Sequence, residues 1–474
     1  MLYQLLMESN SDIKCSTIHA NGRHYSYREL EKLSKGFCAF LDSYGITRGS
    51  KIVIVTEPNI CTVAAILGCI YYGVVFVPIG NDSSLKEREH IIHEVGAKLV
   101  VENLTEKMLK MAGTISSREY LIGSDMVYVL YTSGSSGYPK GVVGCVSQII
   151  FCIKKINERL MNTCEDRILC ALPLSFDYGL YQIFLALSAG ADLYLEDGKV
   201  LQTLISTLKK ERITAFPVVP SMLHALCYSG LFRRTRLPYL RYICATGDRL
   251  NLHVVKRIHE QFPHAEIIPM YGLTECKRVS VMPFNHYHKT LEGSCGLPLD
   301  GVKVRLLDEN EDGVGQLIVI GENVMTGYYG ADEESVFFVD SDTSQKALHT
   351  GDLFRIDSEG FLYYCGRIKR IIKSKGFRIS NAQIERYFYD LEAVREVRAE
   401  GIPDEMIGEK IGLAIYGEID FLRKQFDTIY KSISTLYRPD IIYFSFEPLP
   451  KNANGKFDDK KICMQIMDKG KKWI

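Results

Sequence analysis

The sequence predicts an α/β protein in which parallel-rich sheets covered by helices form a large N-terminal region with a small β-barrel subdomain, followed by a small α+β C-terminal domain. The 474 residues suffice for two to four domains at about 100–200 residues each. Apolar strand-like runs alternate with amphipathic helix-like segments up to about residue 275, which indicates parallel sheets covered on both faces. Short strands and Gly-rich turns then predict the β-barrel, and the pattern changes again near residue 368.

Local signals define the first elements. Ser26 and Glu29 form a capping-box pattern, and apolar residues recur behind it at helical spacing until Gly45 ends the helix. The uncharged run 62–79 reaches the lower length limit of ~17–25 residues for a membrane span, but Pro78 and its turn signals favour a buried helix followed by a buried strand. The elements predicted here are a strand at 51–55, a helix at 60–72, a strand at 74–77, a helix near 87–95 and a strand at 98–101.

The later elements continue this alternation and then depart from it. They are a strand at 126–131, a helix containing Ile149, Ile153, Ile156 and Leu160, short strands at 302–307, 315–320 and 360–365, a strand at 371–373, a helix opened by Ser380 with Gln383, strands around 394–402 and 409–416, and a helix near 421–436. We therefore divide the chain into residues 1–368, with the β-barrel at about 283–367, and residues 369–474.

Composition disfavours several classes of function. The 57 Lys and Arg residues balance the 57 Asp and Glu residues, so no global basic field would draw the chain to nucleic acid or to an anionic membrane. The fourteen cysteines are scattered without C-x-x-C spacing, which is typical of reduced thiols rather than of a disulfide frame or a zinc site. The first residues lack the pattern of a secretory signal. We expect a cytoplasmic protein without nucleic-acid or membrane partners.

The segment 131–141, Tyr-Thr-Ser-Gly-Ser-Ser-Gly-Tyr-Pro-Lys-Gly, carries the strongest chemical signal. It follows a predicted strand, and its hydroxyls, glycines and lysine can offer backbone N–H groups, side-chain donors and a positive charge to a polyphosphate. It is neither a Walker A loop nor a nucleophile elbow, because G-x-x-x-x-G-K-[S/T] and G-x-S-x-G are both absent there. A flexible surface linker, the alternative, does not require the preceding strand or the Pro-Lys-Gly ending.

This loop closely resembles the phosphate loop of the adenylate-forming superfamily, which includes acyl-CoA synthetases, the adenylation domains of nonribosomal peptide synthesis, and luciferases. Four further motifs agree in order and spacing across essentially the whole chain. They lie at 271–275 (Y-G-x-T-E), 350–352 (T-G-D), 366–378 (G-R…K-x-x-G-F-R) and 450–456 (the C-terminal lysine motif). The resemblance implies ATP and Mg²⁺ as cofactors and the formation of an acyl-AMP with release of pyrophosphate.

Each motif also has a physical interpretation. Tyr271 offers a flat face to adenine, Glu275 is a hard oxygen ligand for Mg²⁺, and Asp352 suits the ribose hydroxyls. Taken singly, each has a structural alternative as a core tyrosine, a carboxylate at a helix N-terminus or a turn residue. The expected nucleotide-binding residues are Thr132, Ser133, Gly134, Ser135, Ser136, Gly137, Lys140, Gly247, Asp248, Tyr271, Gly272, Asp352 and Arg367, with Thr274 and Glu275 expected in catalysis and Glu275 as the metal ligand.

Lys456 is the expected catalytic lysine. A positioned ammonium stabilises the negative charge that develops when a carboxylate attacks the α-phosphorus of ATP, and the Asn454-Gly455 turn favours this role over that of an ordinary solvated lysine. Lys369 occupies the hinge position of the family pattern. The resemblance implies a mobile C-terminal domain that rotates there between an adenylating state, which inserts Lys456, and a thiolating state, which withdraws it.

Residues 172–179 align with the family motif that leads into the acid pocket, where an Asp after Phe binds a substrate ammonium in amino-acid-activating members. Asp177 needs a cation, because a lone buried carboxylate is costly. In one alternative Arg278 pairs with Asp177, and the substrate is a neutral acid. In the other, Asp177 takes an amino group while Lys277 or Arg278 takes a second carboxylate or another polar group. The expected pocket residues are Phe176, Asp177, Tyr178, Tyr181, Pro217, Cys244, Thr246, Met270, Lys277, Arg278 and Val279.

The second alternative resembles stand-alone ligases that join β-amino acids, including dicarboxylic ones, to carrier proteins. We therefore expect an amino acid to be adenylated and then transferred to the phosphopantetheine thiol of a separate carrier protein, because the chain has no Gly-Gly-x-Ser carrier motif. An acyl- or aryl-CoA ligase acting on a non-amino acid is the alternative. A catalytically inactive nucleotide-binding protein is the second alternative. It is disfavoured by the joint presence of Lys140, Thr274, Glu275, Asp352, Arg367 and Lys456.

Overall fold

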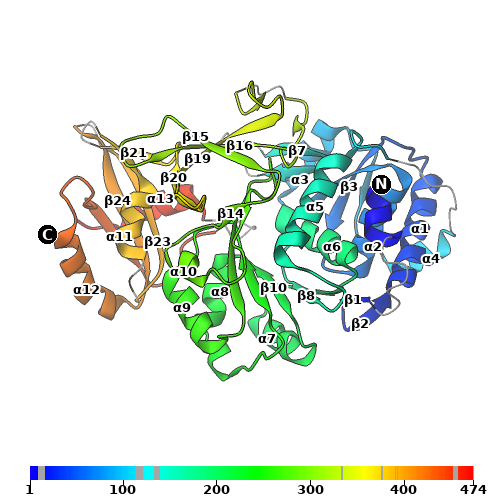
Figure 1. Ribbon diagram of the computed structural model, residues 1–474, viewed down its shortest axis with the longest axis horizontal. Coiled ribbons are helices and arrows are strands. Elements are labelled where there is room, and N and C mark those ends of the chain that lie inside the picture. Colours follow the sequence, from blue (N-terminus) through cyan, green and yellow to red (C-terminus); the bar gives the residue numbers. More distant parts are fainter. Residues whose placement is uncertain are drawn as a thin grey trace.

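The structure is a computed structural model that describes residues 1–8, 16–113, 121–132, 139–331, 335–374, 377–389, 391, 393–404, 406–451 and 457–472. Four sheets organise these residues (Figure 1). Two large, parallel-rich sheets lie side by side in the first two thirds of the chain, and two five-stranded sheets follow. The mixed α/β class predicted from the sequence is confirmed.

The first large sheet has six strands in the order β17-β7-β6-β4-β3-β5. Its central pairs β3–β4, β3–β5 and β4–β6 are parallel, whereas β6–β7 and β7–β17 are antiparallel. The strands are β3 (Lys51–Thr56), β4 (Val75–Gly80), β5 (Leu99–Val101), β6 (Met126–Thr132), β7 (Lys140–Cys145) and β17 (Gly327–Tyr328), and the helices that accompany them are α1 (Tyr27–Ser43), α2 (Ile60–Tyr72), α3 (Leu85–Val95) and α4 (Glu106–Met111).

Helices α1 and α2 show how local sequence sets this packing. Ser26 caps α1 with the reciprocal Glu29 contact that the sequence predicted. Helix α2 has buried side chains almost throughout and ends at Gly73, whose φ of 73° suits glycine. A Cβ on Gly68 would lie 2.8 Å from the Ser34 carbonyl oxygen, so glycine lets the two helices approach closely. In the described chain, no helix is long and apolar enough to cross a membrane.

The second large sheet has nine strands in the order β14-β13-β12-β11-β10-β8-β9-β1-β2. Its middle pairs are parallel, and antiparallel pairs close both edges. The strands are β1 (Thr17–Ala20), β2 (Arg23–Ser26), β8 (Arg167–Cys170), β9 (Asp192–Leu195), β10 (Ala215–Val218), β11 (Tyr242–Ala245), β12 (Glu266–Tyr271), β13 (Ser280–Val281) and β14 (Leu297–Pro298).

Helices α5 and α6 lie between the two large sheets (Figure 1) and contribute to one shared hydrophobic core with strands from both. This core therefore fixes the two sheets relative to one another. The helices of this half are α5 (Val146–Leu160), α6 (Asp177–Ala189), α7 (Leu201–Lys210), α8 (Pro220–Tyr228), α9 (Leu252–Gln261) and α10 (Tyr287–Leu291), with a π-helix at Gln4–Glu8 and a 3-10 helix at Phe232–Arg234.

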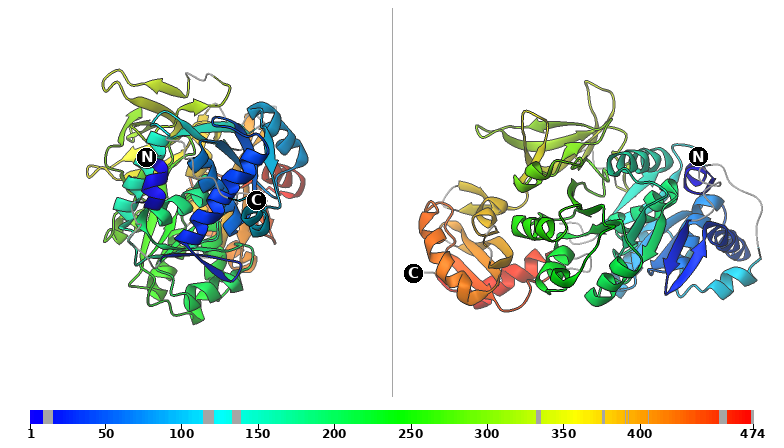
Figure 2. Two further views of the ribbon diagram at one scale, coloured as in Figure 1. Left: turned by 90° about the vertical axis from the view of Figure 1, so that its right-hand side faces the viewer. Right: turned by 60° about the horizontal axis from the view of Figure 1, so that its bottom comes forward.

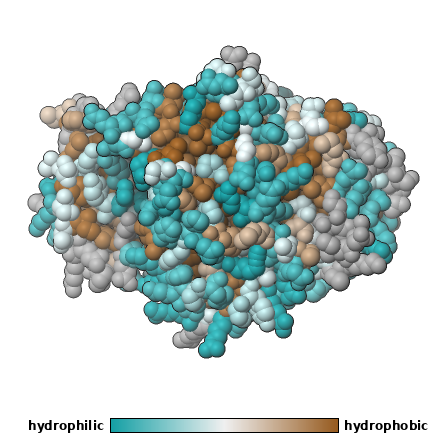
Figure 3. All heavy atoms as spheres, viewed as in Figure 1, coloured by the Kyte–Doolittle hydropathy of each residue, from teal (hydrophilic) through white to brown (hydrophobic). Residues whose placement is uncertain are grey.

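The subdomain expected as a small β-barrel is a five-stranded antiparallel sheet in the order β15-β16-β19-β18, with β20 also pairing β19. The sequence did not predict its longest strand, β19, which carries Asp352. On the face shown in Figure 3, hydrophobic side chains gather where Figure 1 places β19 and β20. The strands are β15 (Lys303–Leu307), β16 (Val314–Ile320), β18 (Phe337–Val339), β19 (Lys346–Ile356) and β20 (Leu362–Arg367).

The C-terminal unit has its own cores and forms a separate body at one end of the molecule (Figure 2). Its sheet has the order β22-β21-β24-β23, and β25 pairs with β24 in parallel. Lys369 lies in the turn between β20 and β21. The elements are β21 (Ile371–Ser374), β22 (Phe377–Ser380), α11 (Asn381–Tyr389), β23 (Val394–Asp404), β24 (Gly408–Gly417), α12 (Ile419–Ser432), β25 (Ile441–Ser445) and α13 (Asp459–Lys469).

The cysteines of the described chain are all free, and most of them are buried. Burial raises the pKa of thiols such as Cys152 and Cys170 to about 12. These residues therefore behave as core thiols of low reactivity.

Candidate active site

The segment that follows β12 carries most of the expected catalytic and acid-binding residues. It can form its tight turn only with glycine at position 272, because a Cβ there would lie 1.8 Å from the Lys277 carbonyl oxygen. Lys277 itself has a φ of 56°, a left-handed conformation that is uncommon for a residue with a side chain. The turn thus places Thr274, Glu275 and the two following cations within a short stretch between β12 and β13.

The predicted nucleotide residues Tyr271, Asp352 and Arg367 contact one another. The Tyr271 hydroxyl donates a 2.7 Å hydrogen bond to Oδ2 of Asp352, and Nε of Arg367 lies 2.8 Å from Oδ1. Asp352 is 1% exposed and pairs in register with Arg367 across β19 and β20. Burial and this carboxylate raise the pKa of Tyr271. The three side chains form a fixed, hydrogen-bonded polar site in which Arg367 remains half exposed.

Tyr328, which was not predicted from the sequence, contacts both Lys140 and Glu275. Nζ of Lys140 lies 5.0 Å from the centre of the Tyr328 ring, and the Tyr328 hydroxyl donates a 2.8 Å hydrogen bond to Oε1 of Glu275. Tyr328 reaches this place because β17 pairs with β7, the strand that Lys140 begins. Thr132 also lies here and donates to the Lys140 carbonyl at 3.5 Å.

Five residues of the expected phosphate loop and the expected catalytic lysine fall outside the described residues. They are Ser133, Gly134, Ser135, Ser136, Gly137 and Lys456.

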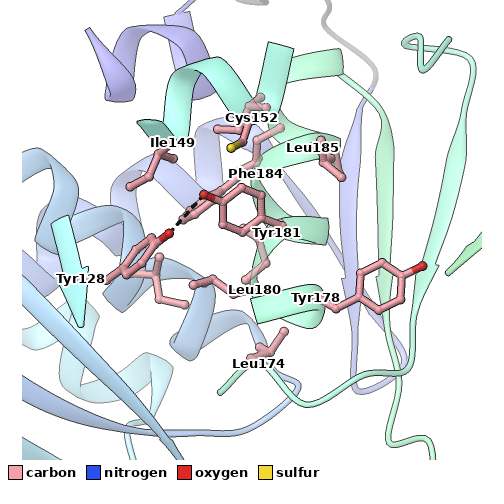
Figure 4. Close-up of a cluster of buried hydrophobic side chains, with 14 of the residues drawn as sticks. Tyr128, Ile149, Cys152, Leu174, Tyr178, Leu180, Tyr181, Phe184 and Leu185 are labelled. Carbon is pink, nitrogen blue, oxygen red and sulfur yellow. Dashed lines mark hydrogen bonds between the residues drawn. The ribbon is translucent and has the colours of Figure 1, made fainter. Parts of the chain in front are cut away.

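The predicted acid pocket contains a buried ion pair between α6 and the turn after β12. Nζ of Lys277 lies 3.7 Å from Oδ2 of Asp177, the first residue of α6. The same ammonium lies 4.6 Å from the centre of the Tyr181 ring and 5.2 Å from that of Tyr128. Figure 4 shows Tyr128 and Tyr181 facing one another, with 3.1 Å between their hydroxyl oxygens. Lys277 is therefore held by one carboxylate and two aromatic rings.

Arg278 does not pair with Asp177, which corrects one of the two alternatives drawn from the sequence. Its Nη1 donates a 3.0 Å hydrogen bond to Oγ1 of Thr246, and its guanidinium lies 5.0 Å from the centre of the Tyr178 ring. Adjacent side chains leave the backbone in different directions, so Lys277, and not Arg278, meets Asp177. Figure 4 shows Tyr178 pointing from α6 in a different direction from Tyr181.

The other expected pocket residues lie on the strands around this pair. Tyr178 donates to the carbonyl oxygen of Cys244 at 3.0 Å, and Cys244 pairs in register with Pro217. Met270 lies on β12, Val279 follows the turn and is buried, and Phe176 precedes α6.

The pocket holds an excess of positive charge. Asp177, Lys277 and Arg278 are 8%, 2% and 5% exposed, so two cations and one carboxylate are buried together. Burial lowers the pKa of Lys277 to about 8, although Asp177 opposes the shift. Among the described residues, Nζ of Lys277 and Nε of Arg278 have no hydrogen-bond partner. The arrangement can accept a cation at Asp177 and an anion at the two donors.

A cavity between the N-terminal region and the C-terminal unit lies beside the expected nucleotide-binding residues Gly247 and Asp248 and the expected pocket residue Phe176. It is lined by Phe176 and Gly247 on one side and by Lys451 and Phe457 on the other. Lys451 and Phe457 form a β-bridge and flank the segment that contains Lys456. The φ of Gly247 is 101°, a conformation that glycine adopts freely.

Direct contacts join the two parts beside this cavity. The Tyr389 hydroxyl donates to the Arg249 carbonyl at 2.8 Å, and the Asn251 side chain donates to the Tyr389 carbonyl at 3.0 Å. An Arg398 nitrogen lies 3.6 Å from a carboxylate oxygen of Asp248. In this arrangement Lys451 and Phe457, which flank the segment that contains Lys456, line the same cavity as Gly247 and Asp248, which are expected to bind the nucleotide.

The AMP-binding enzyme family matches residues 10–329, about two thirds of the chain, so the protein belongs to this family. The chain is 25% identical over 517 residues to 4-coumarate–CoA ligase 1 of Solanum tuberosum, covering 98% of this chain and 93% of that protein. It is also 25% identical over 481 residues to D-alanine–D-alanyl carrier protein ligase of Bacillus cereus strain G9842, covering 93% and 94%. The protein is an AMP-forming acid–thiol ligase.

Two solved structures are informative. o-Succinylbenzoate CoA synthetase of Bacillus subtilis, in complex with its acyl-adenylate, has a TM-score of 0.86 at 22% identity and covers 99% of both chains, which shows the shared fold. The complex of VinN with L-aspartate has a TM-score of 0.68 at 29% identity and covers 77% of this chain and 98% of that chain.

The buried environment of Lys277 generates a titration prediction. In protein labelled at lysine side-chain carbons, NMR should show one lysine that titrates near pH 8 and disappears in Lys277→Met, because burial disfavours its charged form. Between pH 8 and the usual lysine pKa of about 10.4, the unfolded chain binds the proton that the folded chain has released. The stability of the wild type should therefore rise over this window relative to Lys277→Met. A Lys277 signal that titrates above pH 10 would contradict the buried assignment.

Proposed function

We propose that this ligase activates an amino acid that carries a second carboxylate, forming an aminoacyl-AMP and pyrophosphate from ATP, and then transfers the acyl group to the phosphopantetheine thiol of a separate carrier protein. The observation that supports this substrate class is the burial of Asp177 together with Lys277 and Arg278.

Pairing of individual charged groups connects the pocket to the substrate. The two cations and one carboxylate leave one positive charge in excess, and uncompensated buried charge is unfavourable. Beyond the carboxylate that reacts, the proposed substrate brings one ammonium and one carboxylate. Its ammonium binds Asp177, and its second carboxylate binds Lys277 and Arg278, whose Nζ and Nε have no hydrogen-bond partner in the described chain. This substrate adds no net charge, so it pairs the charged groups locally, whereas an acid without a second carboxylate would leave the two donors without a partner.

Two relatives support this assignment. VinN, solved with L-aspartate, is a structural neighbour at 29% identity, and aspartate has an ammonium and two carboxylates. D-Alanine–D-alanyl carrier protein ligase, by its name, joins an amino acid to a carrier protein. The relative named 4-coumarate–CoA ligase covers 98% of this chain and favours CoA as the second candidate acceptor.

For ATP, we propose that Asp352 and Arg367 bind the ribose hydroxyls, while Tyr271 and the Gly247 backbone flank the adenine. The phosphates bind the predicted loop and Lys140, with Thr274 donating to an α-phosphate oxygen. Tyr328 orients the carboxylate of Glu275 through their 2.8 Å hydrogen bond. These residues hold the α-phosphorus and the substrate carboxylate in line, which lowers the entropic barrier to attack.

Glu275 fits a Mg²⁺ ion, because its partly exposed carboxylate is a hard oxygen donor beside Lys140 and Tyr328. The described residues contain no group of three or more His, Cys, Asp or Glu side chains able to hold a metal, so phosphate oxygens would supply other ligands. When bound, Mg²⁺ neutralises phosphate charge as pyrophosphate leaves.

We assign Lys456 to the first half-reaction and the boundary at residues 368 and 369 to the rotation that follows it. Lys451 and Phe457, which flank the lysine segment, line the cavity beside Gly247 and Phe176. The turn that contains Lys369 is short and connects two strands, as expected of a hinge in which few backbone angles change.

Pyrophosphate exchange tests the substrate class. The wild type should exchange labelled pyrophosphate into ATP with amino acids that carry two carboxylates, and about 10- to 100-fold less with their amides, alanine, β-alanine, fatty acids and aryl acids. Asp177→Asn should weaken activation of the amino dicarboxylic acid more than of its deaminated analogue. Arg278→Met should instead weaken activation of the amino dicarboxylic acid more than activation of the amide of its second carboxylate. Equal activity across the acids would contradict the proposal, and activity restricted to neutral acids would favour the CoA-ligase alternative.

The lysine assignment separates the two half-reactions. Lys456→Ala should reduce pyrophosphate exchange by roughly 100-fold or more, because the variant loses charge stabilisation at the α-phosphorus. It should change transfer from pre-formed aminoacyl-AMP to a carrier thiol by less than about threefold. Lys460→Ala, which changes an exposed lysine of α13, is the matched control for exchange. Exchange that survives in Lys456→Ala would contradict the assignment.

A further inference from the structure

We propose that Asn323 is a positioning residue that sets the selectivity of the acid pocket by clamping the backbone on both sides of Lys277. The inference rests on the proposed function, in which Lys277 and Arg278 bind a second carboxylate. Asn323 touches neither charged side chain in its hydrogen bonds, so its effect on the acid passes through the turn.

The contacts of Asn323 are specific. Its side-chain nitrogen donates to the carbonyl oxygen of Cys276 at 3.0 Å and to that of Arg278 at 3.2 Å. Two carbonyl acceptors require the amide nitrogen at this position, because the amide oxygen cannot donate. Asn323 is fully buried, so water does not readily replace these bonds if the side chain is removed.

The turn that contains Lys277 has a backbone conformation that needs support from its surroundings. Lys277 has a φ of 56°, and the left-handed region is unfavourable for a residue with a side chain. Gly272 leaves room for the Lys277 carbonyl on one side of the turn. Asn323 bonds the carbonyl groups of the residues before and after Lys277. If this backbone relaxes, the directions of the Lys277 and Arg278 side chains change together.

The neighbouring residues of the same segment serve the phosphate side of the site. The Met325 N–H donates to the Glu275 carbonyl at 2.8 Å, and the Tyr328 hydroxyl donates to the Glu275 carboxylate. The hydrogen bonds of Asn323 reach Cys276 and Arg278, which lie on the acid side. Loss of the Asn323 amide should therefore impair recognition of the acid while use of ATP persists.

The test compares selectivity in full-length variants. In pyrophosphate exchange, Asn323→Ala should lower kcat/KM for the amino dicarboxylic acid by about 10- to 100-fold through KM, and for its amide by less than about threefold. The KM for ATP should change by less than about threefold. Asn323→Ser keeps one donor and should give an intermediate ratio. Asn157→Ala is the matched control, because Asn157 also donates from its amide to a backbone carbonyl, that of Leu185, away from the pocket.

The outcomes are distinguishable. A folded Asn323→Ala that keeps the wild-type ratio between the acid and its amide contradicts the positioning role and leaves the proposed function standing. A wild type that does not discriminate between them contradicts both. If Asn323→Ala does not fold, the ratio in Asn323→Ser decides: an unchanged ratio contradicts the inference, and a reduced ratio at unchanged KM for ATP supports it. Equal losses for acid, amide and ATP in a folded variant also contradict it.

Discussion

The buried pairing of Asp177 with Lys277 is the constraint on which the acid pocket depends. A carboxylate and an ammonium taken out of water need one another, and each also needs hydrogen bonds that the pair alone does not supply. Their atoms lie 3.7 Å apart, which is longer than a hydrogen bond, and two tyrosine rings complete the surroundings of the lysine. The addition of Arg278 leaves a surplus of positive charge. The pocket is therefore suited to an anion that the described residues do not provide.

Two separate elements of the fold carry the charged residues of the acid pocket. Asp177 begins α6, which lies in the core shared by the two large sheets, and the two cations follow β12 at the edge where parallel strands end. Ligands of open α/β sheets bind at such edges. The nucleotide side of the site depends instead on the antiparallel sheet, because β19 and β20 place Asp352 beside Arg367 and Tyr271. The two reactants thus meet between parts of the chain that are far apart in sequence.

The sequence predicted those features that local patterns determine. It placed the buried helix α2 at its observed bounds, because Asn59 caps its start and Gly73 ends it with a left-handed backbone. It also named Tyr271, Asp352 and Arg367, which contact one another, and Asp177 and Lys277, which form an ion pair. It missed Tyr128, whose ring centre lies 5.2 Å from Nζ of Lys277. The strand β19 was not predicted, because its bent, half-exposed course depends on β16 and β20 rather than on its own alternation.

The sequence alone could not decide whether Lys277 or Arg278 pairs with Asp177. Lys277 and Arg278 are neighbours about a hundred residues from Asp177, and the choice between them depends on the left-handed backbone of Lys277. Tyr328 and Asn323 were missed because each acts through a long-range contact, with a carboxylate and with two carbonyls respectively. Glycines with a positive φ lie near both residues, Gly321 near Asn323 and Gly327 beside Tyr328, but a glycine does not indicate which side chain makes a distant contact.

Proton uptake on substrate binding is a direct test of whether a second carboxylate binds at Lys277. Lys277 has a pKa of about 8, so near pH 8 its side chain is roughly half protonated. A carboxylate bound beside it should raise this pKa, and the amine should then take up a proton from solvent. Calorimetric titration with an amino dicarboxylic acid, in buffers that differ in ionisation enthalpy, should show uptake of about half a proton in the wild type and a clear loss of that uptake in Lys277→Met. No uptake in the wild type, or the same uptake in Lys277→Met, would contradict a second carboxylate bound at this lysine.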